Sequence, residues 1–306
     1  MNDSQFALLL VAGVALASPL LWAAIGELIS EIAGVLNIHL EGMMLVGAFM
    51  GVLGAHHSGS VWIGFLVAAA GGALLAAIHA VVCFVFHANQ IVSGVVLNIF
   101  AIGATTFGLS VAFSQGARPS INTIDKVKIP GLSDLPLIGP ALFNQNVLVY
   151  VGFLLVPAVW WFLNRTAGGL RVKAVGEKAD AADSLGVPVR RTRTLALLAC
   201  GVLAGIGGAQ LSLAGVGTFT DNMTAGRGFI ALAAVVFGRW KPVGTIVAVI
   251  VFALADALAI RAQTLGVHIP NQLLLMLPYL VTMIALAGLV RRMRPPSQLG
   301  LNFERE

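Results

Sequence analysis

The chain has 306 residues, of which 18 are Lys or Arg and 13 are Asp or Glu, so 10% of it is charged, whereas soluble domains carry about 25%. Its mean hydropathy is +0.93, and so small a chain cannot bury that much apolar surface in a soluble core. These values exclude a disordered chain, a secreted disulfide scaffold and a cytosolic enzyme, and they indicate an all-α polytopic membrane protein.

Apolar runs bounded by polar, Gly or Pro residues predict the membrane-spanning segments, since a helix needs about 20 apolar residues to cross a bilayer. In chain order the runs lie at 6–26, 43–55, 61–87, 91–113, 147–163, 194–214, 228–238, 243–260 and 272–290. The runs 43–55 and 228–238 are too short to cross, and each follows a polar stretch that contains Gly. We therefore expect eight or nine transmembrane segments, two of them half-helices, in a single domain over residues 1–306.

The position of the cations predicts the orientation of the chain. Residues 164–193 hold seven Lys or Arg residues and three acids, and the tail from Arg291 holds four Arg residues. Because Lys and Arg are retained on the cytoplasmic side, both segments are expected inside and the amino terminus outside. The segment 114–145, with four prolines, is then an external loop, while 88–90 is an inner turn and 56–60 an outer turn. No soluble domain with interleaved aromatic residues presents the cations, so no nucleic acid is expected as a partner.

Ionisable side chains at membrane depth are candidates for function, because each costs about 2.5–3.5 kcal/mol to insert. They are Glu41, Asp221, Arg227 and Asp256, with Glu27 and Glu31 in addition. Glu41 and Asp221 head the two short runs, where a carboxylate can also cap free backbone N–H groups. Glu27 and Glu31 are expected at an inner interface with water available, and Asp256 can pair with Arg261. The acids are isolated, whereas a proton-coupled carrier would place a chain of carboxylates across the bundle.

The motifs of common enzymes are absent from the sequence. No Lys follows a Gly, so the chain cannot form the GxxxxGK[ST] loop that holds ATP phosphates. The HExxH and GxSxG motifs of zinc and serine hydrolases are absent too. Cys83 and Cys200 lie inside apolar runs and are expected to be packing residues, and His79 and His87 form no close pair. We expect no catalytic residue, no metal site and no cofactor on this chain.

The most specific segment is 174–188, AVGEKADAADSLGVP. Gly176 and Glu177 are expected to open a helix that Gly186 and Pro188 end. A helix of about ten residues is too short to be stable alone in water, and the small residues in it let a partner approach closely. The alternative is an ordinary helix on a surface loop.

This segment resembles the coupling helix of permeases from binding-protein-dependent, ATP-driven importers, in the group that serves ribose, branched-chain amino acids and nucleosides. Residues 31–49 resemble the pattern around the second helix of that group, and residues 226–238 resemble its late half-helix. The matching positions in the first pattern are Asn37, Glu41, Gly42 and Gly47. The three motifs occur in order over nearly the whole chain, which is most similar to the simple-sugar and nucleoside arm. Lys178 and His39 depart from the residues usual in the group.

The resemblance implies a type II ABC importer-like permease fold in the bacterial cytoplasmic (inner) membrane. It also implies a heterodimer with a second, homologous permease, cytoplasmic ATPase subunits and an external solute-binding protein. ATP and Mg would bind the ATPase partner, whose closure would move the docked helix and switch the central cavity between the two sides. The implied ATPase-coupling residues are Gly176, Glu177, Ala181, Ala182, Leu185 and Gly186.

Polar residues near the short runs are candidates for the solute pathway, because discontinuous helices expose backbone groups near a cavity and neutral amides suit an uncharged, hydroxylated solute. The candidates are Asn37, Glu41, Asn98, Asp221 and Asn222. The implied function is import of a small neutral solute, with a nucleoside first and a simple sugar next. An ion-coupled secondary carrier, and the same importer class serving branched-chain amino acids, remain alternatives.

Overall fold

A computed structural model describes residues 3–113, 119–133, 135, 139–264 and 294–303 of the chain. The predicted run 272–290, Arg291 and part of the predicted loop 114–145 lie outside the described residues. The elements are α1 (Asp3–Ile32), α2 (Leu40–Ser58), α3 (Val61–Phe84), α4 (Gln90–Ala112), β1 (Lys126–Lys128), α5 (Gly139–Phe143), β2 (Asn144–Asn146), α6 (Val147–Arg165), α7 (Ala167–Glu177), α8 (Ala179–Ser184), α9 (Val189–Ala209), the π-helix η1 (Gln210–Val216), α10 (Arg227–Phe237) and α11 (Pro242–Thr264).

Within the described residues, six helices are long and apolar enough to cross a membrane. They are α1, α3, α4, α6, α9 extended by η1, and α11. Each coincides with an apolar run that the sequence predicted. A long apolar stretch forms a helix in lipid because only a helix pairs all of its backbone N–H and C=O groups there. The expected multi-pass helical protein is confirmed.

The two short runs differ in outcome. α10 has 11 residues, about 16 Å, and is short as predicted. The expectation of a half-helix at 43–55 is wrong in its length, because α2 has 19 residues and spans about 28 Å. The polar residues that bounded the apolar run do not end the helix: Met43 N donates to His39 O, and only Gly59, with φ 69°, closes the other end.

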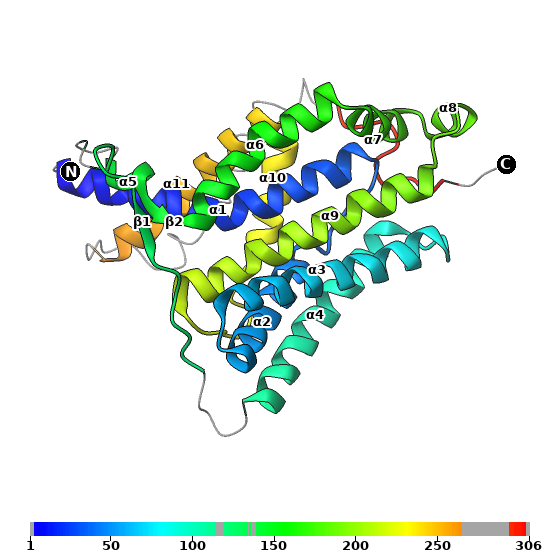
Figure 1. Cartoon of the computed structure of the whole chain (residues 1–306). Coiled ribbons are helices and arrows are strands. Elements are labelled where there is room, and N and C mark those ends of the chain that lie inside the picture. Colours follow the sequence, from blue (N-terminus) through cyan, green and yellow to red (C-terminus); the bar gives the residue numbers. More distant parts are fainter. Residues whose placement is uncertain (1–2, 114–118, 134, 136–138, 265–293, 304–306) are drawn as a thin grey trace.

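α9 packs against α1, α2 and α3 and lies along the length of the bundle (Figure 1). Glycines make the close approach possible. A Cβ on Gly208 would overlap the carbonyl oxygen of Met44, and a Cβ on Gly47 would overlap the backbone of Gly205. In lipid, where no hydrophobic force drives helices together, such close backbone contact supplies the packing energy.

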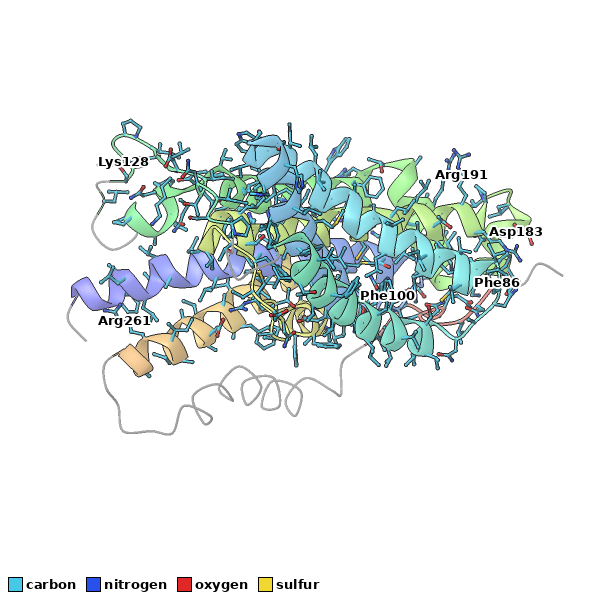
Figure 2. The ribbon with its side chains drawn as sticks, turned by 90° about the horizontal axis from the view of Figure 1, so that it is seen from below. Phe86, Phe100, Lys128, Asp183, Arg191 and Arg261 are labelled. Carbon is cyan, nitrogen blue, oxygen red and sulfur yellow. The ribbon has the colours of Figure 1, made fainter. Side chains whose placement is uncertain are left out.

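The connecting segments gather at two opposite ends of the helices. The start of α1, α5 and the β1–β2 hairpin lie at one end, and α7 and α8 lie at the other (Figure 1). Figure 2 shows the same separation, with Lys128 at one end, Asp183 and Arg191 at the other, and the apolar Phe100 on the flank. The Arg190 guanidinium lies 3.2 Å from His87 Nε2, so the turn 88–90 shares the end of α7 and α8. Which end faces the cytoplasm stays a prediction.

Candidate functional site

The N-termini of α2 and α10 meet inside the bundle at the carboxylate of Glu41. Glu41 Oε1 accepts hydrogen bonds from Thr224 Oγ1 at 2.5 Å and from Gly226 N at 2.8 Å, and Oε2 accepts one from Gly228 N at 2.6 Å. Gly226 is the N-cap of α10 and has φ 86°, a backbone conformation that glycine adopts at no steric cost. These contacts satisfy backbone donors that the first turn of α10 cannot pair within its own helix.

Glu41 therefore caps α10 and not α2, the helix that contains it. It stands in the first turn of α2, so its negative charge lies between two helix ends that both carry partial positive charge. The side chain is only 5% exposed, and both oxygens are already engaged. Capping of backbone N–H groups is confirmed for Glu41, though at α10 and not at the run that it heads. Contact with a solute stays a prediction.

Two of the candidate asparagines are buried at the segment that leads into α2, and Asn98 bonds its backbone. Asn98 Oδ1 accepts from Gly42 N at 2.8 Å, and Asn98 Nδ2 donates to Ile38 O at 2.9 Å. Asn37 is buried, with Nδ2 at 3.1 Å from Cys200 Sγ. The Asn98 amide thus pairs backbone groups that the break before Leu40 leaves without helical partners.

The other two pathway candidates lie apart from this cluster. Asp221 and Asn222 are exposed, in the turns that connect η1 to α10. Asn222 has φ 52°, which Asn tolerates better than most residues. The five predicted pathway residues therefore divide into a buried group at the junction and an exposed pair on the connecting turn.

A cavity of about 410 Å³ lies beside that turn and contains polar residues that the sequence did not single out. Thr220, Met223 and Arg227 line it together with Ser18 of α1 and Gln210 of η1. Ser18 Oγ donates to Gln210 Oε1 at 3.0 Å, both side chains are buried, and Gln210 Nε2 has no partner among the described residues. The signal that could have found Gln210 is its position as an amide inside an apolar run. π-helical turns such as η1 are frequent at functional sites.

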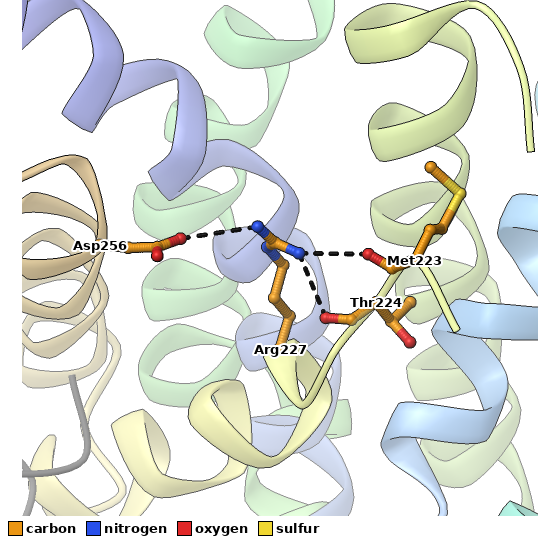
Figure 3. A network of polar contacts seen from close by, with 4 residues as sticks. All are labelled: Met223, Thr224, Arg227 and Asp256. Carbon is orange, nitrogen blue, oxygen red and sulfur yellow. Dashed lines mark hydrogen bonds and ion pairs between the residues drawn. The ribbon is translucent and has the colours of Figure 1, made fainter. Parts of the chain in front are cut away.

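Arg227 and Asp256 form an ion pair between α10 and α11. Arg227 Nη2 lies 3.6 Å from Asp256 Oδ2, and Nη1 donates to the carbonyls of Met223 and Thr224 (Figure 3). The sequence did not predict Arg227 as a partner of Asp256, because the two residues lie on neighbouring helices. Pairing of Asp256 with Arg261 stays a prediction. The Arg227 guanidinium thus connects the start of α10 to α11, and it also bonds the turn at Met223 and Thr224.

The expectation that Glu27 and Glu31 lie at a wet interface is also wrong. Both side chains are fully buried, with 0% exposure. Glu31 accepts a hydrogen bond from Trp240 Nε1, and Glu27 accepts one from Cys200 Sγ. The partners of the two carboxyls come from α9 and from the turn after α10, which lie distant in the sequence.

The predicted coupling segment forms a helix, but with different limits. Gly176 and Glu177 close α7, and α8 begins only at Ala179, so the expectation that they open the helix is wrong. Lys178 has φ −148° and ψ 87°, which breaks the helical path between them. The predicted end is confirmed: Gly186 has φ 80° and donates to Asp183 O, while Val187 N donates to Ala182 O. This is the Schellman arrangement that satisfies the last helical carbonyls.

The proposed coupling residues differ in what they face. Gly176 is buried, and a Cβ on it would overlap Ile32 O at the end of α1. Ala182 is buried with Ala179, Val175 and Val189. Ala181, Leu185 and Gly186 are exposed, Leu185 to 85%, and Glu177 accepts from Ser297 Oγ at 2.9 Å.

Residues 9–286 match the family described as "Branched-chain amino acid transport system / permease component". The chain belongs to this permease family. It is 41% identical, over 97% of its length and 98% of the relative, to a putative glucose ABC transporter permease protein, TsgC13 of Haloferax volcanii. It is 38% identical to the guanosine ABC transporter permease protein NupQ of Bacillus subtilis and 37% identical to the nucleoside ABC transporter permease protein NupC of Lactococcus lactis, over 94% of the chain and 93% of each relative.

More distant matches in the same two bacteria, NupP at 25% and NupB at 23% identity, are also named guanosine and nucleoside ABC transporter permease proteins. The relatives of this permease thus occur as pairs of differing permease proteins. No solved structure matches the chain.

Proposed function

We propose that this permease is one membrane subunit of an ATP-driven importer that moves a nucleoside, or secondly a simple sugar, across the bacterial cytoplasmic membrane. The observation that carries the proposal is the similarity along nearly the whole chain to permeases named for guanosine and for nucleosides. The glucose permease relative at 41% identity supports the sugar as the second candidate. Its partners are a second permease, an ATPase that binds ATP and Mg, and an external solute-binding protein.

The exposed side of α8 receives the ATPase in this proposal. Leu185 makes the apolar contact with the ATPase, and the small side chain of Ala181 lets the ATPase approach the helix closely. A displacement of α8 reaches α1 through α7, which ends against Ile32 at Gly176. α1 in turn holds the far end of α10 through the hydrogen bond from Trp240 to Glu31. This chain of contacts connects the docking surface to the short helix, and ATP binding supplies the free energy that shifts the equilibrium between the two orientations.

The solute passes the exposed turn between η1 and α10. Asp221 and Asn222 stand on this turn, and the adjoining cavity offers the unpartnered amide of Gln210. Neutral donors and acceptors suit sugar hydroxyls and nucleobase edges, while Leu211 and Met223 supply apolar wall. A volume of about 410 Å³ falls within the range of about 300–1,000 Å³ typical of small-molecule pockets.

The full topology has eight or nine transmembrane segments, with the start of α1 and the β1–β2 hairpin outside and α7 and α8 inside. The positive-inside rule supports this orientation, since Arg165, Arg171, Lys173, Lys178, Arg190, Arg191 and Arg193 gather at the end of α7 and α8. A cysteine placed at Lys126 will react with an impermeant maleimide from the outside of intact cells. Reaction from the cytoplasm alone would contradict the orientation.

Uptake in cells tests the function. A strain that lacks this chain is compared with its parent for uptake of labelled guanosine, labelled pentose or glucose, and labelled leucine. The proposal expects loss of guanosine uptake with leucine uptake intact, and the same loss in a strain whose ATPase subunit carries an inactive nucleotide site. Loss of leucine uptake alone favours the branched-chain amino acid alternative. Uptake that persists without the ATPase and follows an ion gradient means a secondary carrier.

A further inference from the structure

A second cavity, of about 540 Å³, opens at the end of the bundle that holds α7 and α8. It lies between the end of α6, the end of α7 and the turn that joins α10 to α11. Four cations line it, namely Lys173, Arg239, Lys241 and Arg294. Among the described residues of the lining, Glu177 is the one acid, and it accepts the hydrogen bond from Ser297. The lining thus carries four cations against one acid.

The turn between α10 and α11 is built in an uncommon backbone conformation. Arg239 and Trp240 have φ 57° and φ 53°, two consecutive residues other than glycine in the left-handed region. Such a conformation is strained for residues other than glycine and persists where the surroundings hold it. Its result is that a guanidinium and an indole both border the same cavity.

The outer wall of the cavity is apolar and aromatic. Trp160 of α6 is 43% exposed and Val243 of α11 is 61% exposed, and both line the opening. Tryptophans at helix ends favour the level of the lipid headgroups, and an exposed valine at the start of a spanning helix faces acyl chains. A ligand that enters here meets cations on one side and hydrocarbon on the other.

We propose that this cavity binds the phosphate headgroup of an anionic phospholipid from the leaflet at the α7–α8 end. Cationic pockets between transmembrane helices recognise such headgroups because the phosphate pairs with Lys and Arg while the acyl chains stay in the bilayer. The apolar opening favours a lipid over a free phosphate ion, which gains nothing from Trp160 and Val243. The bound headgroup joins Lys173 of α7 to Lys241 at the start of α11, on either side of the last turn of α6. The site is independent of which solute the permease carries.

Native mass spectrometry of the purified full chain in mild detergent tests this site. The ligands are dioleoyl-phosphatidylglycerol, dioleoyl-phosphatidylcholine and sn-glycerol 3-phosphate, each titrated separately. We expect the wild-type chain to retain phosphatidylglycerol in preference to phosphatidylcholine and to retain no glycerol 3-phosphate. The double variant Lys173→Gln, Lys241→Gln is expected to bind phosphatidylglycerol about 30-fold more weakly, the effect of removing two cations near a lipid surface. Lys241→Gln alone is expected to lose about fivefold.

The matched control removes two cations from the same end that do not line the cavity. Arg165 and Lys178 are both exposed, and the double variant Arg165→Gln, Lys178→Gln is expected to keep wild-type affinity for phosphatidylglycerol. Circular dichroism checks that each variant is folded. If the double variant does not fold, the affinity of the single Lys241→Gln variant for phosphatidylglycerol decides the test. An equal loss in the control, equal retention of phosphatidylcholine, or retention of glycerol 3-phosphate with the affinity of the lipid would each overturn the proposal.

Discussion

Two polar regions of this permease, the junction at Glu41 and the surface of α8, use their polar groups in opposite ways. At the junction a buried carboxylate accepts three hydrogen bonds and closes the start of α10. On α8 the polar groups face water, and Leu185 is 85% exposed beside them. Buried polar groups must be paired within the protein because the cost of leaving them unpaired is large, whereas exposed ones contribute little to folding.

The difference separates what holds the helices together from what meets a partner. Substitutions at the junction should lower the free energy of unfolding. Substitutions on the exposed side of α8 should leave it nearly unchanged and act only in the assembled transporter. Four substitutions, ordered by the expected loss of unfolding free energy, test this separation.

The largest loss is expected for Glu41→Ala. It removes the acceptor of three buried donors, each worth about 1–3 kcal/mol when left unpaired. We expect at least about 3 kcal/mol of destabilisation, with a lower yield of folded protein and a lower Tm in detergent. Glu41→Gln, which keeps one oxygen acceptor of the same size, should lose less than Glu41→Ala. An unchanged Tm for Glu41→Ala would show that the junction does not stabilise the fold.

The next loss is expected for Gly208→Ala, since the added Cβ would overlap Met44 O and force α2 away from α9. Overpacking of this kind costs about 1–3 kcal/mol. The matched control is Gly103→Ala on α4, where a Cβ meets nothing within 4 Å and alanine favours the helix. Gly208→Ala should have a clearly lower Tm than Gly103→Ala. Equal Tm values would refute the close approach of α9 to α2 at Gly208.

A smaller loss is expected for Asp256→Asn. The ion pair with Arg227 is 3.6 Å long, and its side chains are 22% and 23% exposed, so solvent screens it and its contribution is about 0–1 kcal/mol. Arg227→Gln should cost more than Asp256→Asn, because the guanidinium also donates to Met223 O and Thr224 O. The reverse order in Tm would contradict this assignment.

The smallest loss of stability is expected for Leu185→Ser, within about 0.5 kcal/mol. In the assembled importer the same change removes an apolar contact of the proposed ATPase interface, where single residues can each be worth about 2 kcal/mol. ATP-dependent uptake should therefore fall about tenfold or more while the Tm stays constant. Val187→Ser is the matched comparison: this half-buried side chain packs against the small core under α8, so its substitution should lower the Tm.

Hydropathy predicted the spanning helices because a backbone in lipid must pair its own N–H and C=O groups, which a helix does. It failed at α2, where Glu41 and His56 interrupt the apolar run but not the backbone hydrogen bonds. It also failed to say which helix Glu41 caps, since the partner lies on a segment distant in sequence. The same limit explains Asp256, which pairs with Arg227 on α10, and Glu27 and Glu31, whose partners are Cys200 and Trp240.

The coupling segment shows what a resemblance adds and what it misses. The end of α8 at Gly186 follows from local turn chemistry and was predicted. Its start was not, because Gly176 and Glu177 look like a helix opening but finish α7, and only the extended backbone of Lys178 separates the two helices. Burial of Gly176 and Ala182 depends on contacts with α1 and α9 that local sequence does not encode.

Cysteine protection measures the docking role of α8 most directly. Cys83 and Cys200 are buried, so a cysteine at Leu185 will be the reactive one among these three, and a second variant with cysteine at Lys126, at the opposite end, serves as the reference. The account predicts that maleimide labels position 185 in the permease alone and that the assembled ATPase protects it, while labelling at 126 stays constant. Equal labelling of position 185 with and without the ATPase would contradict the claim that α8 is the docking surface.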